Sequence, residues 1–255
     1  MKAIKNQILL ALLLLTFSSS ISFGQSFEGK LTYIVAFEIE TQNFGGIEIT
    51  KEQILEKTKA DGEFFDTITI TIKNGNYLKE DNALLNKKII YKADENKVYT
   101  IEKDFEYVII SDANEISQVK LVKFQEPIFE QIDTNAMING IECKLIKLSW
   151  DGLGEELYYY NSEVISIDPK LFAKHNLEYF NTILNLTGSY PIETIKTISS
   201  FMSIKMTLVN ISEEKIEDSV FDLPKLKKAK KDYSEMLLNI TGAEVMKIKG
   251  KAKKK

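Results

Sequence analysis

Alternation of apolar and polar residues is the feature that most limits what this chain can fold into. In Thr67–Ile72, threonine and isoleucine alternate strictly, and this two-residue period places the isoleucines on one face of a strand. Asn74-Gly75 follows at once and favours a type I′ hairpin turn, because both central positions of that turn need positive φ. The pattern predicts antiparallel sheet.

The same period recurs before and after this hairpin. Residues Leu31–Ile39 put alternate apolar side chains on one face. In Ile141–Trp150 the apolar phase changes near Leu145, which predicts a bulge or burial on both faces. Further strands are expected at Lys88–Lys92, Lys97–Glu102, Glu106–Ile110, Glu156–Tyr160 and Met202–Leu208.

Two segments carry helix signals. Thr50 with Gln53 three residues later forms a capping box, so a helix is expected to start there. Asp168-Pro169 starts a second helical segment that should stop at Gly188, and His175-Asn176 can break it into two. The expected fold class is α+β: a mostly antiparallel β-sheet, open or half-barrel, with two helical coverings.

Residues 1–24 have the form of a secretory signal. Lys2 and Lys5 precede the apolar run Ile8–Phe17, and cleavage is expected ahead of Gln25. The run is about half of the ~20 residues that span a bilayer, which favours a cleaved signal over an anchor. No Cys follows the run, so the protein is expected to be exported, periplasmic or secreted, and not lipid-anchored.

The chain beyond the signal divides by charge. Residues 225–255 hold 11 Lys and three acidic residues, a net of +8, so residues 1–224 carry −12 of the total of −4. No Pro/Gly/Ser-rich linker interrupts residues 28–224. The expected division is a signal peptide (1–24), one β-rich domain (25–224) and a lysine-rich tail (225–255) with a short amphipathic helix. The acidic domain makes a nucleic-acid partner improbable.

Two interpretations of the tail are open: it binds an anionic membrane surface, or it is a solvated, disordered end. Apolar residues at helical spacing over residues 233–240 support the first interpretation, because flanking lysines would then face lipid headgroups. The membrane-surface candidates are Lys227, Lys228, Lys230, Lys231, Lys253, Lys254 and Lys255.

Several residue types are scarce or absent, and this excludes whole classes of site. The chain has no Arg, one His and one Cys, so bidentate guanidinium clamps, multi-histidine metal sites and disulfides within the chain are not available. Phosphate-binding loops, HExxH and GxSxG are also missing. No cofactor and no metal are expected, and the protein is expected not to be an enzyme. Carboxylate-based hydrolysis stays open.

Each single residue that could carry chemistry also has an ordinary structural explanation. His175 and Asp168 lie about two helical turns, ~10 Å, apart on a continuous helix, too far for a direct hydrogen bond. A histidine on the helix surface or at its break is the better interpretation. Cys143 lies in an apolar strand pattern and is expected to be buried and inert.

Acidic residues give no firm site. Glycoside hydrolysis needs two carboxylates facing each other across a cleft, which sequence cannot show. Asp61, Glu63 and Asp66 fit a calcium loop only loosely, because Ile72 stands where the bidentate ligand would be. The carboxylate pairs considered are Glu155-Glu156, Glu213-Glu214 and Glu217-Asp218.

One strand face and one helix are the candidate lining of an apolar ligand chamber. Methionines on Met202–Leu208 would adapt to irregular apolar partners, and the segment Phe172–Leu186 is the natural cover for that face. An ordinary packed core explains the same pattern. Tyr158–Tyr160 are expected to be core and cross-strand residues rather than a sugar-stacking surface. The ligand-lining candidates are Met202, Ile204, Met206, Leu208, Phe172, Tyr179 and Ile183.

The order of these elements resembles that of exported Gram-negative proteins of the periplasmic lipoprotein-carrier (LolA-like) family. The features are an N-terminal strand and helix, a meander, the helical insert Asp168–Gly188, and a closing strand that ends in Phe221-Asp222-Leu223-Pro224. The resemblance covers about residues 27–224. It implies a curved, unclosed sheet whose concave apolar face, covered by helices, receives acyl chains.

Two functions from different classes follow. The resemblance implies an exported, non-enzymatic envelope protein that binds an apolar ligand or a lipid-linked partner. The alternative is a protein-interaction or structural module of the envelope, with a filled core, that acts through a sheet edge or an outer face. A cavity would favour the first function, since fold alone does not give function.

Overall fold

A computed structural model describes residues 26–44, 47–102, 107–116, 126–150, 154–199, 202–225 and 228–231. The predicted signal, the predicted helix over residues 233–240, and Lys227 and Lys253–Lys255 lie outside these ranges and stay predictions. Twelve strands form one sheet: β1 (Gly29–Ile39), β4 (Thr67–Lys73), β5 (Asn76–Asp81), β6 (Lys88–Lys92), β7 (Lys97–Ile101), β8 (Tyr107–Asp112), β9 (Ile128–Ile138), β10 (Ile141–Trp150), β11 (Gly154–Tyr160), β12 (Pro191–Ser199), β13 (Met202–Glu213) and β14 (Lys228–Lys231).

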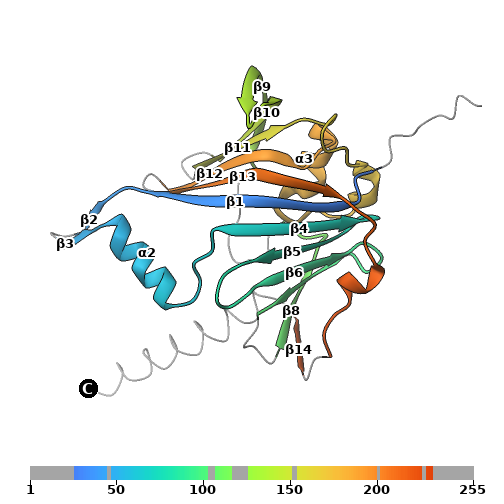
Figure 1. The fold of residues 1–255 in the computed structure, drawn as a ribbon, viewed down its shortest axis with the longest axis horizontal. Coiled ribbons are helices and arrows are strands. Elements are labelled where there is room, and N and C mark those ends of the chain that lie inside the picture. Colours follow the sequence, from blue (N-terminus) through green and yellow to red (C-terminus); the bar gives the residue numbers. More distant parts are fainter. Residues whose placement is uncertain are drawn as a thin grey trace, which may run out of the picture.

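The sheet is open and almost entirely antiparallel (Figure 1). Its spatial order is β14-β8-β7-β6-β5-β4-β1-β13-β12-β11-β10-β9. The pairing of β14 with β8 is parallel, and within the described residues the end strands β14 and β9 do not pair with each other. A separate ribbon joins β2 (Gln42–Phe44) to β3 (Ile47–Ile49). The predicted open antiparallel sheet is confirmed.

The strands predicted from local sequence patterns in the first half of the sheet are confirmed. Asn74 has φ of 47° and Gly75 has φ of 80°, the two positive values that a type I′ turn requires. Isoleucines of β4 are buried on one face, with Ile68 and Ile72 at most 2% exposed. The strand predicted at Lys88–Lys92 has those bounds.

Two long strands, β9 and β12, have no counterpart in the sequence prediction. In β12 the isoleucines recur every three residues, at Ile192, Ile195 and Ile198, a spacing closer to a helix than to a strand. The pairing of β12 with β11 shifts register around Ile192, and this irregularity resets the alternation. For β9 a signal was present, because Asn139-Gly140 ends the strand with a second hairpin turn.

The phase change in β10 reflects burial on both faces. Cys143 and Leu145 are buried on one face, while Ile146 and Leu148 are buried on the other. The pairing with β11 is regular over residues 144–150, whereas the pairing with β9 shifts between Cys143 and Leu145. The irregularity therefore lies in β9, opposite β10.

The helix α2 (Lys51–Ala60) forms as predicted but covers nothing. Thr50 Oγ1 accepts from the amide of Gln53, and the Gln53 side chain accepts from the amide of Thr50, which confirms the capping box. No residue of α2 is buried. Figure 1 shows α2 apart from the sheet. The expectation of two helical coverings is therefore wrong for this helix.

The second helical segment does cover the sheet. This insert (residues 169–187) consists of η1 (Pro169–Phe172), η2 (Leu177–Tyr179) and α3 (Phe180–Thr187). Asp168 Oδ1 accepts from the amide of Lys170, and Gly188 ends α3 with φ of 59°. The expected break at His175-Asn176 is confirmed, because η1 and α3 are separate helices. Leu186 is 51% exposed, and Leu184 is buried in its place.

The sheet has an inner face, which the insert covers, and an outer face. The inner face packs against Phe172, Leu177 and Leu184 of the insert in the largest apolar cluster. The outer face of β5–β8 packs against Ile216 and η3 (Asp218–Phe221) in a second cluster. A strand beyond Pro224 was not expected, but β14 adds Lys228–Lys231 to the sheet edge.

Candidate ligand-binding face

The strands β1 and β13 form the centre of the inner face. Their register pairs Phe37 with Ile204, Val35 with Met206 and Tyr33 with Leu208, and directly opposed residues project to the same face. The predicted row of Met202, Ile204, Met206 and Leu208 therefore lies on the inner face. The insert approaches this row at its Leu208 end, because Leu208 and Phe172 belong to one buried cluster.

One end of the inner face, here the packed end, is filled with aromatic rings. Tyr77 and Tyr91 stack at 5.4 Å, and Phe172 packs edge-on against Phe180 at 5.3 Å. His175 lies among these rings, 4.2 Å from the ring centre of Tyr91 and 4.6 Å from that of Phe180. Such pairs add to the stability already given by burial, so the packed end fixes the insert to the sheet.

His175 is a core residue rather than a surface residue. It is 2% exposed, its Nε2 lies 3.0 Å from the Tyr77 hydroxyl, and its Nδ1 has no hydrogen-bond partner in the described residues. Burial lowers the pKa of His175 to about 4, so the ring is neutral at pH 7. Asp168 instead caps η1, and the two residues form no acid–base pair.

The other end of the inner face, here the open end, is apolar but only half-buried. Phe37, Phe65, Ile204 and Met206 pack against the main cluster without being buried in it. The Phe37 and Phe65 rings meet edge-on at 5.6 Å. Half-buried apolar side chains on an open sheet are the surface that an apolar ligand could cover.

The seven predicted lining residues are distributed over both ends. Phe172 is fully buried and Leu208 is 4% exposed, so neither is free to touch a ligand in this conformation. Ile183 joins a separate cluster with Ile146, Leu148 and two tyrosines. Tyr179 contacts Phe129 of β9, with ring centres 5.9 Å apart. Met202, Ile204 and Met206 stay half-buried, and their role as ligand contacts stays a prediction.

Charged side chains also share the inner face with these apolar residues. Glu156 and Lys196 are register partners on β11 and β12, and their charged atoms lie 3.7 Å apart. Burial raises the pKa of Glu156, although Lys196 opposes the shift. Lys79 on β5 is half-buried, and burial lowers its pKa.

The sheet curls around the insert. Tyr77 on β5 and Ile146 on β10 are six strand spacings apart in the sheet order, about 29 Å in a flat sheet. Phe180 of α3 nevertheless lies 5.7 Å from Tyr77, ring centre to ring centre, and Ile183 of the same short helix packs with Ile146. The inner face is therefore concave, with β5 and β10 on opposite walls.

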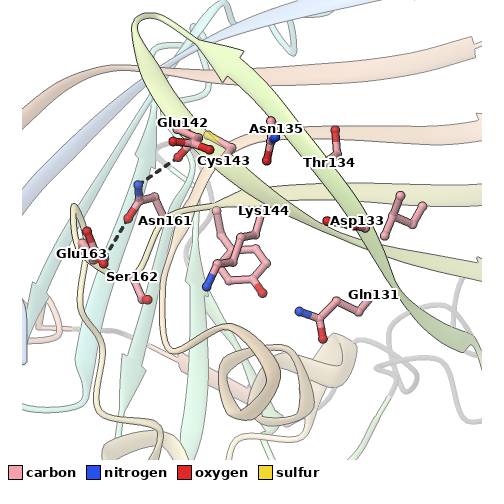
Figure 2. A pocket seen from close by; sticks show the side chains of 12 residues that line it. Gln131, Asp133, Thr134, Asn135, Glu142, Cys143, Lys144, Asn161, Ser162 and Glu163 are labelled. Carbon is pink, nitrogen blue, oxygen red and sulfur yellow. Dashed lines mark hydrogen bonds between the residues drawn. The ribbon is translucent and has the colours of Figure 1, made fainter.

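A polar pocket of about 620 Å³ lies where β9 departs from β10 (Figure 2). The Asn161 side chain donates to the Glu142 carbonyl at 2.9 Å and accepts from the Glu163 amide at 2.8 Å. Glu163 also borders a second polar pocket, of about 510 Å³. The sequence patterns did not predict the 620 Å³ pocket, because they did not predict β9, which forms one side of it. The residues that line the 620 Å³ pocket are Gln131, Ile132, Asp133, Thr134, Asn135, Glu142, Cys143, Lys144, Tyr160, Asn161, Ser162 and Glu163.

The carboxylates singled out in the sequence mostly pair with lysines. Glu155 lies 2.6 Å from Lys147, and Asp218 lies 2.8 Å from Lys73. Glu214 and Glu217 also form lysine ion pairs, and Glu213 is exposed. In the proposed calcium loop, Asp61 pairs with Lys57, while Asp66 accepts from Asn82. No cluster of three His, Cys, Asp or Glu suited to a metal ion occurs in the part of the chain that the structure describes.

The remaining candidates are core residues, as expected. Cys143 is 1% exposed, and burial raises the pKa of its thiol, so thiolate chemistry is disfavoured. Tyr158 and Tyr160 are buried on the inner face, and Tyr159 is half-buried on the other. The Tyr158 hydroxyl donates to the Ser189 carbonyl at 3.1 Å.

Comparisons with known proteins give likeness of fold alone. No family model matches the chain, and no curated protein matches it by sequence. One similar solved structure is an uncharacterised conserved protein from Thermus thermophilus, with a TM-score of 0.43 and 8% identity over 80% of this chain and 91% of that one. Another is a LolA superfamily protein from Nitrosomonas europaea, with a TM-score of 0.35 and 9% identity over 79% of this chain and 92% of that one.

These values describe a coarse similarity in the course of the chain. No helix within the described ranges is long and apolar enough to cross a membrane.

Proposed function

We propose that the protein is an exported, non-enzymatic binding protein that holds the acyl chain of an amphiphile, free or attached to a partner, against the open end of the inner face. The observation that carries this proposal is the half-buried apolar set Phe37, Phe65, Ile204 and Met206 on a concave, open sheet. Water on such a surface would be released by an apolar ligand, with a gain of about 25 cal/mol per Å² covered.

Export is part of the same proposal and rests on residues 1–24. An envelope location would expose the protein to lipids and lipid-linked molecules.

The first test is native purification, followed by solvent extraction and mass spectrometry of the bound material. Recovery of a fatty acid or lipid supports the proposal. A protein that carries no lipid, and that fails to bind a fluorescent fatty acid when one is supplied, contradicts it.

A pair of variants locates the binding surface. Met206→Glu places a charge on the half-buried inner face, where desolvation penalises it, and binding of the fluorescent fatty acid is expected to fall at least ~10-fold. Ile34→Glu adds the same charge on the outer face of β1, where Ile34 is 51% exposed, and should bind as the wild type does. Equal binding by both variants would place the ligand elsewhere.

The alternative of a protein-interaction module has one specific observation in its favour. The strand β9 is an edge of the sheet, and its Ile128 and Met137 are 70% and 64% exposed. An exposed edge can accept a strand from another chain. Native purification separates the two functions, since this one predicts a defined protein rather than a lipid.

A further inference from the structure

Lys79 interrupts an apolar row that runs across the inner face. Ile70 of β4 is the register partner of both Leu31 on β1 and Lys79 on β5, and Ile89 of β6 follows as the next partner. Leu31 is fully buried and Ile70 is 7% exposed. A half-buried lysine therefore stands in line with the core residues of three neighbouring strands.

This lysine has no ion-pair partner among the described residues. Glu178 and Asp81 influence it electrostatically, as do Lys87 and Lys196 with the opposite sign, but none of the carboxylates forms an ion pair with it. The Asp81 Oδ1 atom instead accepts from the amides of Ala83 and Lys87. A charge withdrawn from water without a partner is unfavourable.

The other inner-face charges differ in this respect. Glu156 and Lys196 compensate each other at 3.7 Å. On the outer face of the same hairpin, Lys88 lies 2.7 Å from Glu80. Lys79 is thus a half-buried inner-face charge for which a counter-charge from outside the chain would complete the site.

We propose that Lys79 binds the anionic head, a carboxylate or a phosphate, of an amphiphile whose acyl chain lies on the open end of the inner face. This proposal rests on the proposed function and adds the charge of the ligand to it. Lys79 lies two residues from Tyr77 of the packed end, so the head would sit at the boundary between the two ends. The chain would then extend away from the insert, toward Met206 and Phe37.

Binding of an anion would also remove an unfavourable feature of the unliganded protein. Desolvation lowers the pKa of Lys79, because burial disfavours the charged ammonium. A carboxylate or phosphate oxygen in contact with Nζ reverses that effect and forms a charge-assisted hydrogen bond, which is stronger than a neutral one. The ligand's charge would therefore contribute to affinity as well as to orientation.

The test compares three probes with one chain and different heads: decanoate, decanol and decyltrimethylammonium. Isothermal titration calorimetry on the wild type should rank decanoate first. Lys79→Met removes the charge and keeps most of the side-chain volume, so decanoate affinity should fall at least ~10-fold while decanol affinity stays the same or rises. Lys79→Arg should retain decanoate binding.

Lys88→Met is the matched control, because it removes one positive charge from the outer face of the adjacent strand. It should leave the affinity for all three probes unchanged. The melting temperature of Lys79→Met should equal or exceed that of the wild type, which would show that lost binding is not lost folding.

The outcomes separate this inference from the proposed function. If Lys79→Met binds decanoate as the wild type does, Lys79 is a solvated lysine and the inference fails, whereas acyl binding stands. If the wild type binds none of the three probes, the proposed function fails. Inorganic phosphate and acetate test the contribution of the anionic head alone. If either binds as tightly as decanoate, the ligand is a free anion and the proposal of an amphiphile is wrong.

Discussion

The two ends of the inner face belong to one sheet but differ in their packing. At the packed end, Phe172 is fully buried and Tyr91 is 1% exposed under the insert. At the open end, Phe37 and Met206 are apolar yet half-buried, and the nearest helix, α2, has no buried residue. The sheet supplies an apolar surface longer than the insert covers. The packed end stabilises the fold, and in our proposal the open end of the same face binds the ligand.

The largest expected effect contrasts one phenylalanine from each end. Phe172→Ala leaves a cavity between Tyr91 and Phe180 and should lower the free energy of unfolding by about 3–5 kcal/mol. Phe37→Ala removes a ring that water already reaches, so a loss of about 1–2 kcal/mol is expected. Urea denaturation of both variants measures the difference.

The two variants should also differ in ligand binding. Phe37→Ala should weaken binding of a fluorescent fatty acid, whereas folded Phe172→Ala should retain most of it. A destabilisation by Phe37→Ala as large as that by Phe172→Ala would mean that the open end is a closed core, and the contrast between the ends would disappear.

The second prediction uses pH to probe the packed end. The pKa of His175 is about 4 in the folded protein and about 6.5 in an unfolded chain. The unfolded state therefore binds the proton more readily, so the stability from neutral His175 is complete above pH 6.5 and is lost as pH falls toward 4. The expected loss between pH 7.5 and pH 5 is about 2 kcal/mol.

His175→Gln isolates this contribution, since glutamine does not titrate and can still hydrogen-bond to Tyr77. Urea unfolding at the two pH values should show a loss smaller by about 2 kcal/mol in the variant. Identical pH dependence of the two proteins would place His175 in contact with water and contradict its burial. Fatty-acid binding at the open end should not follow the same titration.

How much of this could be read from the sequence depends on whether the signal was local. The Thr67–Ile72 strand, its Asn74-Gly75 turn and the Thr50 capping box each depend on residues within a few positions, and all three were predicted. The strand β12 was missed because an irregularity at Ile192 breaks its alternation. Tertiary packing rather than sequence decides such positions.

The positions of the inner-face charges also could not be predicted from local sequence patterns. The alternation of β5 put Lys79 on the same face as Tyr77, but only the pairing with β4 and β6 identifies that face as the inner one. His175 was expected at a helix break, which is correct, yet its burial depends on Tyr77 and Tyr91, which are distant in sequence. Contacts between distant residues built the candidate site, so local patterns could not predict it.

The smallest expected effect tests how the insert is held at the packed end. Gly75 and Gly140 each follow an asparagine in a two-residue hairpin turn, with φ of 80° and 81°. A Cβ at position 75 would lie 2.7 Å from the Leu171 carbonyl oxygen, whereas a Cβ at position 140 would meet nothing within 4 Å. Alanine costs about 1 kcal/mol at either turn, because an L residue is strained at positive φ.

Gly75→Ala should therefore be less stable than Gly140→Ala by about 1 kcal/mol, the added penalty of overlap with the insert backbone. Thermal unfolding measures the difference, and amide exchange over residues 169–187 should quicken in Gly75→Ala alone. If the two variants melt together, the turn adapts without disturbing η1. The insert would then be held by its aromatic contacts, and Phe172→Ala would remain the decisive probe of the packed end.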